Sequence, residues 1–270
     1  MSNTPRRSAI VTGAGSGIGE AVARRLSREG HHVVLIGRRA EPLQAVARAC
    51  GGTAIVGDAA DPSVAAMAVE TCVAAAGGVD VVIANAASGG GGALADVSDE
   101  DWASSWQTNV NTAFVVLRAT LPSLRERRGS IVVVASIAGL AAGPSMAPYV
   151  TAKHALIGMT RSIARDEGPL VRANVVCPGW VRTAIGDAEM VRLAALHGLA
   201  DVDAAYALAT RDTPLRRAAN ADEVANVVWF LASNEASAMT GAVIPVDCGA
   251  TAVDVPRSPS PAREPALNRR

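Results

Sequence analysis

Cysteine is scarce in this sequence of 270 residues, and neither sign of charge is in excess. The four cysteines (Cys50, Cys72, Cys177 and Cys248) form no CxxC pair and no ligand-like grouping with histidine. This pattern is typical of reduced thiols in a cytoplasmic protein. Acidic and basic residues number 25 each, so no global field favours nucleic acid or an anionic membrane as a partner. We therefore expect a cytoplasmic protein with no metal site and no nucleic-acid partner.

Long apolar runs are also missing. No uninterrupted run reaches the roughly 18 apolar residues of a membrane-spanning helix, so we expect no membrane association. Arg6 and Arg7 precede an apolar run that ends after four residues at the sequence TGAGSGIG, which is too short for a signal peptide. Half of the residues are nevertheless hydrophobic, which is enough for a sizeable core.

Seven short runs rich in β-branched residues recur along the chain, at residues 8–12, 32–36, 53–56, 79–84, 130–135, 172–177 and 242–246. Their hydrophobicity is continuous rather than alternating, which indicates strands buried on both faces and hence a parallel sheet. Longer helical patterns separate the runs. The sequence therefore predicts an α/β fold, a single-domain doubly wound (Rossmann-type) parallel sheet of about seven strands with helices on both faces.

Helix ends can be predicted from local signals. The helical segments stop at glycines suited to C-terminal caps: Gly30, Gly51, Gly77 and Gly168. Ser98 and Asn220 each precede an acidic residue by three positions, the spacing of an N-terminal cap.

The domain prediction has three parts. Residues 1–254 are expected to form one dinucleotide-binding domain. Residues 183–213 have a helical pattern but no strand, and an insertion at that point of a doubly wound sheet is suited to cover a substrate. Residues 255–270 are rich in Pro, Ser and Arg and predict a disordered tail.

A glycine loop follows the first predicted strand. Gly13, Gly17 and Gly19 are spaced GxxxGxG between that strand and a helix. Glycine permits a tight turn and lets backbone N–H groups approach a pyrophosphate at a helix N-terminus. A plain turn is the alternative, but the position after the first strand of several βαβ units favours a dinucleotide.

The end of the second strand bears on the choice of cofactor. Gly37 stands where an acid would bind the ribose 2′-hydroxyl of NAD, and Arg38 and Arg39 follow it. An arginine pair without a carboxylate suits a 2′-phosphate, so NADP is favoured and NAD is the alternative. Asp58 after the third strand is a candidate acceptor for the adenine amino group, and Asn85 after the fourth could fix the backbone beside the ribose. A turn-capping Asp and a loop Asn are the alternatives.

One of only two tyrosines, Tyr149, stands four residues before Lys153 in a helical stretch. Residues at this spacing share a helix face, so the pair is either an ordinary surface pair or a proton donor beside a cation. A free phenol has a pKa of about 10. An ammonium about 4 Å away contributes up to ~4 kcal/mol at an effective dielectric near 20, which is roughly three pKa units. We therefore expect Lys153 to lower the pKa of Tyr149.

Taken together, the glycine loop, Asn85, Asn109, Ser136, the Tyr149–Lys153 pair and the stretch PGWVRT resemble the short-chain dehydrogenases/reductases over nearly the whole chain. The resemblance implies that Asn109, Ser136, Tyr149 and Lys153 are catalytic, with Asn109 interrupting a long helix and holding a water to Lys153. It implies contacts to the cofactor by a larger set: Gly13, Gly15, Ser16, Gly17, Ile18, Gly19, Arg38, Arg39, Asp58, Ala59, Asn85, Tyr149, Lys153, Pro178, Gly179, Val181 and Thr183. The last four would lie at the nicotinamide end.

The implied activity is hydride transfer between NADP and an alcohol or ketone, with Tyr149 as acid or base. An NAD-dependent dehydrogenase of the same family is one alternative, and a dinucleotide-binding sensor without turnover is another. Family members are usually homotetramers or dimers that associate through the helices after strands four and five.

Several features have two interpretations. Met190, Leu193, Leu196 and Leu199 in the insertion hint at an apolar substrate, or they only pack. His197, Tyr206 and Trp180 are candidates for the pocket wall, with ordinary packing as the alternative. The glycine run at residues 89–92 would make the rim of the site flexible, or it is a simple spacer, which is the interpretation preferred here.

Overall fold

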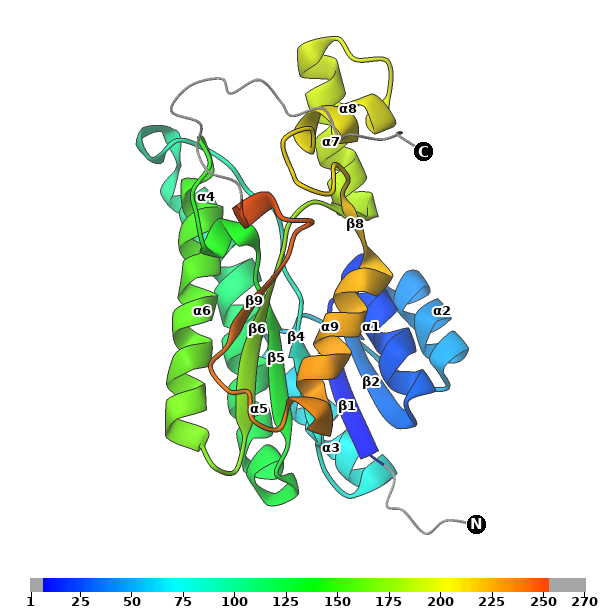
Figure 1. The fold of residues 1–270 in the computed structure, drawn as a ribbon. Helices are drawn as coiled ribbons and strands as arrows, with labels where there is room; N and C mark the ends of the chain where they lie inside the picture. The colour runs from blue at the N-terminus through cyan, green and yellow to red at the C-terminus, as the bar shows by residue number, and fades with distance from the viewer. Residues whose placement is uncertain (1–6, 253–270) are drawn as a thin grey trace, which may run out of the picture.

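The computed structural model describes residues 7–252, which form a layered α/β structure (Figure 1). Its main sheet has seven strands, all parallel, in the order β3-β2-β1-β4-β5-β6-β9. The strands are β1 (Arg7–Thr12), β2 (His31–Gly37), β3 (Thr53–Val56), β4 (Val81–Ala84), β5 (Ser130–Val134), β6 (Arg172–Pro178) and β9 (Val243–Val246). The predicted fold class is confirmed, and each predicted strand lies within two residues of its expected bounds.

Helices cover both faces of the sheet. On one face pack α3 (Pro62–Ala76), α5 (Thr112–Arg127) and α6 (Ala147–Glu167), and on the other α1 (Gly17–Arg28), α2 (Ala40–Cys50) and α9 (Ala221–Ala232). The strands have continuous hydrophobicity because they face two cores. In β1, Ile10 packs in the first core while Ala9 and Val11 pack in the second, and all three are fully buried.

The strand order reverses between β1 and β4. From β1 the chain adds β2 and β3 to one side, then crosses over and adds β4, β5, β6 and β9 to the other. A crevice opens at such a switch point, outside the carboxyl ends of the strands, and ligands of doubly wound folds bind there. The glycine loop after β1 and Asn85 after β4 both lie at this point.

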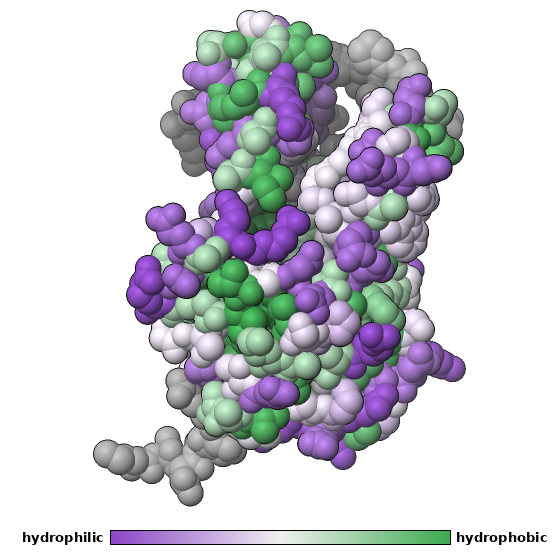
Figure 2. All heavy atoms as spheres, turned by 180° about the vertical axis from the view of Figure 1, so that it is seen from behind, coloured by the Kyte–Doolittle hydropathy of each residue, from purple (hydrophilic) through white to green (hydrophobic). Residues whose placement is uncertain are grey.

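A separate lobe rises above the carboxyl ends of the strands (Figure 1). It contains α7 (Ala184–His197) and α8 (Val202–Ala209), and a two-stranded sheet of β7 (Val181–Arg182) and β8 (Ala219–Asn220) connects it to the main body. The sequence predicted helices here but not this small sheet. From the opposite side the lobe is separated from the rest of the molecule by a notch (Figure 2).

The lobe has a small core of its own, made of Met190, Ala194, Ala205, Tyr206 and Ala218. Tyr206 is 2% exposed and donates a hydrogen bond to Asp187 Oδ1 at 2.9 Å. Of its two interpretations, packing is therefore the one observed. His197 is exposed in the last turn of α7.

Most predicted helix ends are present. Gly51 and Gly77 adopt the left-handed conformation after α2 and α3, and Asn220 with Glu223 forms a complete capping box before α9. Gly168 is the exception, because its φ of −66° and ψ of 143° are extended. The residue before a proline is driven to this region, and Pro169 follows.

Among residues 7–252, no helix combines the length and apolar character needed to cross a membrane. The tail expected at residues 255–270 lies outside the described part of the chain.

Candidate active site

The glycine loop joins β1 to α1 and is held against the end of β4. The Thr12 hydroxyl accepts hydrogen bonds from the backbone N–H groups of Asn85 (2.9 Å) and Ala86 (2.8 Å). The Asn85 amide donates in turn to the Thr12 carbonyl at 2.9 Å. A Cβ on Gly19 would lie 2.7 Å from Asn85 Nδ2 and closer still to the Gly13 carbonyl oxygen, so only glycine fits. Asn85 therefore fixes the backbone at the switch point.

The N-terminus of α1 has backbone N–H groups that are available to bind an anion. Its N-cap residue, Ser16, makes no side-chain capping bond, so the first N–H groups of the helix have no side-chain acceptor. A pyrophosphate is the kind of group that binds at such a helix start. The residues present thus fit a dinucleotide, with Gly15, Ser16, Gly17 and Ile18 around the opening of the helix.

Arg39 reaches the glycine loop from the end of β2. Its Nη2 donates a hydrogen bond to Ser16 Oγ at 2.8 Å. Arg38 and Arg39 are both exposed, and Gly37 leaves no carboxylate between them and the loop. Of the two arginines that the sequence singled out, the structure thus brings Arg39 to the loop.

Asp58 serves as a turn cap after β3, because its Oδ1 accepts a hydrogen bond from the Ala60 N–H at 2.9 Å. Within the described residues its Oδ2 accepts none, so an adenine amino group could still be bound there. The neighbouring Ala59 is buried, at 5% exposure.

Ser136, Tyr149 and Lys153 come together beyond the end of β5. Tyr149 and Lys153 lie on the same face of α6, with Lys153 Nζ 5.4 Å from the centroid of the Tyr149 ring. Lys153 is 2% exposed and donates a hydrogen bond to the Val134 carbonyl at 3.4 Å. Ser136 Oγ accepts from the Ala138 N–H at 3.1 Å, and Ser136 lies near enough to Tyr149 to lower the pKa of its hydroxyl.

Lys153 is also the sole lysine of the chain, since all other Lys and Arg positions are arginine. Arginine remains charged at all physiological pH values, whereas lysine can release its proton when buried. The one basic side chain able to titrate in this way therefore stands beside Tyr149. This singularity was visible in the sequence, and the sequence reasoning overlooked it.

The pKa shifts differ from the expectation that Lys153 lowers the pKa of Tyr149. Burial raises the pKa of Tyr149, and the hydrogen bond with Ser136 offsets part of that rise. Burial also lowers the pKa of Lys153 from its ordinary value of 10.5 to about 8. The expectation was wrong in direction because it counted the attraction between the two groups and left out the cost of removing each charge from water.

Asn109 lies in a π-helical turn, η2 (Gln107–Asn111), between α4 (Asp99–Trp106) and α5. The long helix is thus interrupted where the resemblance implied. Asn109 Nδ2 donates to the Ser105 carbonyl at 3.0 Å, while the buried Asn109 Oδ1 has no partner among the described residues. An unsatisfied buried oxygen of this kind is suited to hold an internal water. Ser105 Oγ is unsatisfied beside it, a polar group that the sequence reasoning missed.

The segment after β6 forms the opposite wall. The Gly179 N–H donates to the Val246 carbonyl at 3.1 Å, and a Cβ on Gly179 would lie 2.9 Å from Asp247 Cβ. Thr183 caps α7 and faces the glycine loop, since its Cγ2 lies 3.2 Å from where a Cβ on Gly17 would be. Val181 is buried in the core on the α9 side, so only its backbone is available to a ligand. Pro178, the last residue of β6, begins this wall.

The loop after β4 contacts the start of the helix that carries Tyr149. The Gly92 N–H donates to the Ser145 carbonyl at 2.7 Å, and its carbonyl accepts from the Ala147 N–H at 3.2 Å. Gly92 has φ +131°, and a Cβ there would lie 2.7 Å from Val97 Cγ2. Interpreting the glycine run as a spacer is therefore wrong for Gly92, which anchors the loop to α6.

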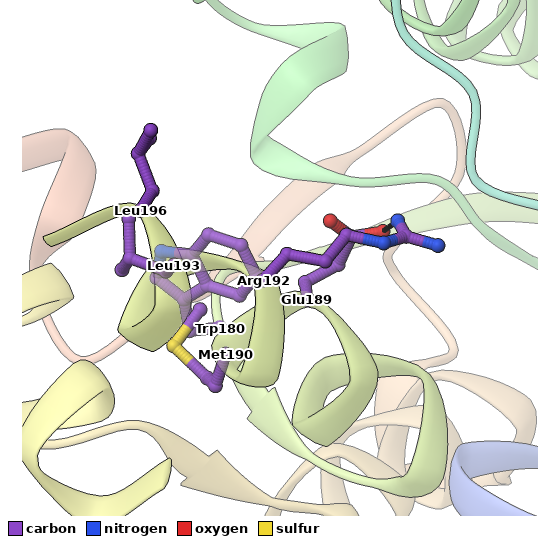
Figure 3. Close-up of a pocket in the computed structure, with 6 residues that line it drawn as sticks. All are labelled: Trp180, Glu189, Met190, Arg192, Leu193 and Leu196. Carbon is purple, nitrogen blue, oxygen red and sulfur yellow. Dashed lines mark hydrogen bonds and ion pairs between the residues drawn. The ribbon is translucent and has the colours of Figure 1, made fainter. Parts of the chain in front are cut away.

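A hollow of about 240 Å³ opens on the lobe (Figure 3). Its lining is mostly large and apolar and consists of Trp180, Met190, Leu193 and Leu196 with Glu189 and Arg192. Trp180 is thus a wall residue rather than a fully packed one. Leu199 instead packs against the core of the lobe.

Comparison with known proteins gives consistent matches. Residues 13–251 match a family model described as Enoyl-(Acyl carrier protein) reductase. Protein MoaE of Klebsiella aerogenes is 43% identical over 93% of this chain and 97% of its own length. The monensin polyketide synthase putative ketoacyl reductase of Streptomyces virginiae is 34% identical over 92% and 98% of the two chains.

Solved structures agree with these relatives. An actinorhodin polyketide ketoreductase crystallised with NADPH superposes with a TM-score of 0.85 at 31% identity, covering 92% of this chain and 98% of its own. An oxidoreductase of Burkholderia thailandensis, described as short chain dehydrogenase/reductase family, superposes with a TM-score of 0.82 at 34% identity over 93% and 95% of the two chains.

Proposed function

The chain belongs to the short-chain dehydrogenase/reductase family, and from that membership we propose that it transfers a hydride between NADP and a ketone or secondary alcohol. Enzymes of this family are oxidoreductases that use a nicotinamide cofactor, and this chain is one of them. Beyond family membership, we propose that the cofactor carries the 2′-phosphate. We also propose the roles of the individual residues and the direction of the reaction.

The observation that carries the proposal is the grouping of Ser136, Tyr149 and Lys153 at the carboxyl edge of the sheet. The Tyr149 ring and Lys153 Nζ are 5.4 Å apart, and Ser136 neighbours the tyrosine hydroxyl. Tyr149 and Lys153 are separated by four residues, whereas enoyl reductases of the family space the two six apart. The grouping therefore supports carbonyl chemistry despite the description of the family model.

In the proposed reaction, the bound nicotinamide supplies the hydride. The Ser136 hydroxyl donates a hydrogen bond to the carbonyl oxygen, and Tyr149 delivers a proton to the same oxygen as negative charge develops there. A tyrosine whose pKa is raised stays protonated at neutral pH, so it is ready to donate. Lys153, with a pKa of about 8, is mostly charged at neutral pH and stabilises the tyrosinate left behind. Asn109 holds a water that returns a proton toward Lys153.

NADP is preferred to NAD because of the surroundings of Arg39. Its guanidinium lies 2.8 Å from Ser16 Oγ at the glycine loop, and Gly37 provides no carboxylate to repel a 2′-phosphate. The NADPH in the actinorhodin ketoreductase structure agrees with this preference.

We further propose that the protein is a cytoplasmic homotetramer or dimer that associates through α5 and α6. Phe114 on α5 is 44% exposed, with the Arg118 guanidinium 4.7 Å from its ring centroid. An exposed phenylalanine under an arginine is suited to burial at an interface. Light scattering after gel filtration tests this: the wild type should elute as an oligomer and Phe114→Glu should shift it toward monomer.

The function itself is tested by absorbance at 340 nm, with NADPH and NADH each offered alongside a panel of ketones. Consumption of NADPH that depends on the ketone is expected. Absence of turnover with every ketone, alongside tight NADPH binding by fluorescence titration, would contradict the enzymatic proposal and favour a sensor.

A further inference from the structure

A second buried polar side chain lies one helical turn before Asn109. Among the residues of α4, all of which the structure describes, Ser105 alone is buried, with 6% exposure. α4 and the π-helical turn η2 both pack against α6, the helix that carries Tyr149 and Lys153 (Figure 1). We assign Ser105 to this contact, because it is the one position at which α4 is closed off from solvent.

The residues around Ser105 and Asn109 leave one polar atom of each without a partner. Ser105 Oγ and Asn109 Oδ1 are both buried and make no hydrogen bond to any described residue. Asn109 is 1% exposed, and its Nδ2 already donates to the Ser105 carbonyl at 3.0 Å, so the orientation of the amide is fixed. A buried hydroxyl or amide oxygen without a partner is costly, and such groups commonly bind an internal water.

The spacing of the two side chains suits one shared water. Ser105 and Asn109 are four residues apart, so they lie on the same face of the helix with their Cβ atoms about 5–6 Å from each other. The bond from Asn109 Nδ2 to the Ser105 carbonyl shows that the amide turns back toward Ser105. A water with hydrogen bonds of about 2.8 Å on either side bridges two such groups.

Lys153 supplies a further donor from the facing helix. Its ammonium has three N–H groups. Among the described residues it makes one hydrogen bond, a long one of 3.4 Å to the Val134 carbonyl, although Lys153 is only 2% exposed. α6 thus has surplus donors where α4 and η2 have an unpaired hydroxyl and an unpaired amide oxygen. A water between them accepts from Lys153 Nζ and the Ser105 hydroxyl and donates to Asn109 Oδ1.

We propose that Ser105 is a positioning residue of the reaction: with Asn109 it holds an internal water between α4 and α6, and this water fixes the Lys153 ammonium beside Tyr149. The inference rests on the proposed function, in which Lys153 stabilises the tyrosinate. A buried water usually has about three partners, and Asn109 and Lys153 supply two of them. Ser105 supplies the third and touches neither substrate nor cofactor.

The first experiment uses the single lysine of the chain as a reporter. In protein labelled with carbon-13 at the lysine ε position, Ser105→Ala should lower the midpoint of the Lys153 titration by about 0.5 to 1 pH unit, the scale of one hydrogen bond. Ser105→Cys should act in the same direction, because a thiol keeps the shape of the side chain but bonds weakly. The matched control is Ser104→Ala, which removes an exposed hydroxyl from the neighbouring position of α4 and should leave the midpoint unchanged.

Two results of this titration would overturn the inference. One is a midpoint in Ser105→Ala that is unchanged or raised. The other is a wild-type midpoint in Ser105→Cys beside a shifted one in Ser105→Ala, which would assign the effect to packing rather than to hydrogen bonding.

Steady-state kinetics separate a positioning role from a merely structural one. In Ser105→Ala, kcat for the best ketone of the panel should fall by about three- to tenfold, and its pH profile should move with the lysine midpoint. The KM values for NADPH and for the ketone should stay within about twofold, because Ser105 touches neither ligand. Ser104→Ala should match the wild type in all of these. A loss that appears in KM with kcat unchanged would contradict the proposed role.

Thermal unfolding provides a readout that needs no turnover. Removing a buried hydroxyl without a partner relieves a desolvation cost and raises the thermal midpoint, whereas removing one that holds a water does not. We therefore expect the midpoint of Ser105→Ala to lie at or below that of the wild type, and a higher midpoint would overturn the inference. The expected titration and unfolding results without any ketone reduction would support the water site and contradict the proposed function. Wild-type kcat and a wild-type lysine midpoint in Ser105→Ala would contradict the inference and leave the proposed function intact.

Discussion

Lys153 Nζ lies 5.4 Å from the centroid of the Tyr149 ring, one turn further along α6, and Lys153 is buried while Tyr149 is half-buried. The two pKa values therefore shift in directions that disfavour charge: that of Tyr149 rises and that of Lys153 falls to about 8. The charged form of each group is therefore harder to reach than it would be in water, so the protein without cofactor favours a neutral tyrosine beside a lysine that can lose its proton near pH 8.

The ionisation of Lys153 can be measured directly because the chain contains no other lysine. Protein grown with lysine labelled with carbon-13 at the ε position should give a single side-chain resonance. We expect this resonance to titrate with a midpoint near pH 8 in the protein without cofactor. A midpoint above pH 10, the range of an exposed lysine, would show that the ammonium is not desolvated.

Replacing Lys153 by Met should stabilise the protein at neutral pH. The folded-state pKa of about 8 lies below the ordinary 10.5, so the folded protein bears the cost of a buried charge at every pH below 8. That cost is up to about 3 kcal/mol, fades as the pH rises from 8 to 10.5, and is absent above that range. Urea unfolding of Lys153→Met should show the gain at pH 7 and lose it by pH 10.5, while activity is lost at both. A variant no more stable than wild type at pH 7 would contradict the burial cost.

Substituting Arg39 should separate the two cofactors. Arg39→Ala removes the guanidinium beside Ser16, so kcat/KM for NADPH should fall by about ten- to a hundredfold, the scale of a hydrogen bond to a charged group. The value for NADH should change by less than about threefold. Arg38→Ala is the matched control with a smaller expected effect. A parallel fall for both cofactors in Arg39→Ala would assign the arginine a role other than binding the 2′-phosphate.

The glycine run should tolerate alanine at one position and not at another. Gly92→Ala places a Cβ against Val97 at φ +131°, and it should cost about 1–3 kcal/mol of stability and lower kcat by shifting the start of α6. Gly90→Ala is the control, because the space around its Cβ is open. Equal thermal midpoints and equal kcat for the two variants would show that the loop does not position the helix.

The fold could be predicted from the sequence because its strands are buried on both faces. Ile10 and Val11 in β1 face different cores, so the run is apolar throughout, and the same logic located the other six strands. The short pair β7 and β8 was missed because two residues per strand leave no pattern. The end of α6 was predicted at the right residue, but Pro169 determines the conformation of Gly168.

The residues of the candidate site could also be identified from the sequence, but their energetics could not. Spacing alone placed Tyr149 and Lys153 on one face, whereas the direction of the tyrosine pKa depends on burial, which only the packing of β5 and α6 reveals. Likewise, the contact of Gly92 with Ala147 depends on how separate segments meet, and the burial of Ser105 depends on what packs against its helix. Residues that act through such contacts leave little signal in a single sequence.

The proposed reaction requires proton transfer by Tyr149. Tyr149→Phe isolates this step, because the ring beside Lys153 is kept and only the hydroxyl is removed. Steady-state reduction of hexan-2-one, or of the best ketone in the panel, should lose about a thousandfold in kcat, while the NADPH dissociation constant changes by only a few-fold. A Tyr149→Phe variant whose kcat stays within a few-fold of wild type would show that another group delivers the proton.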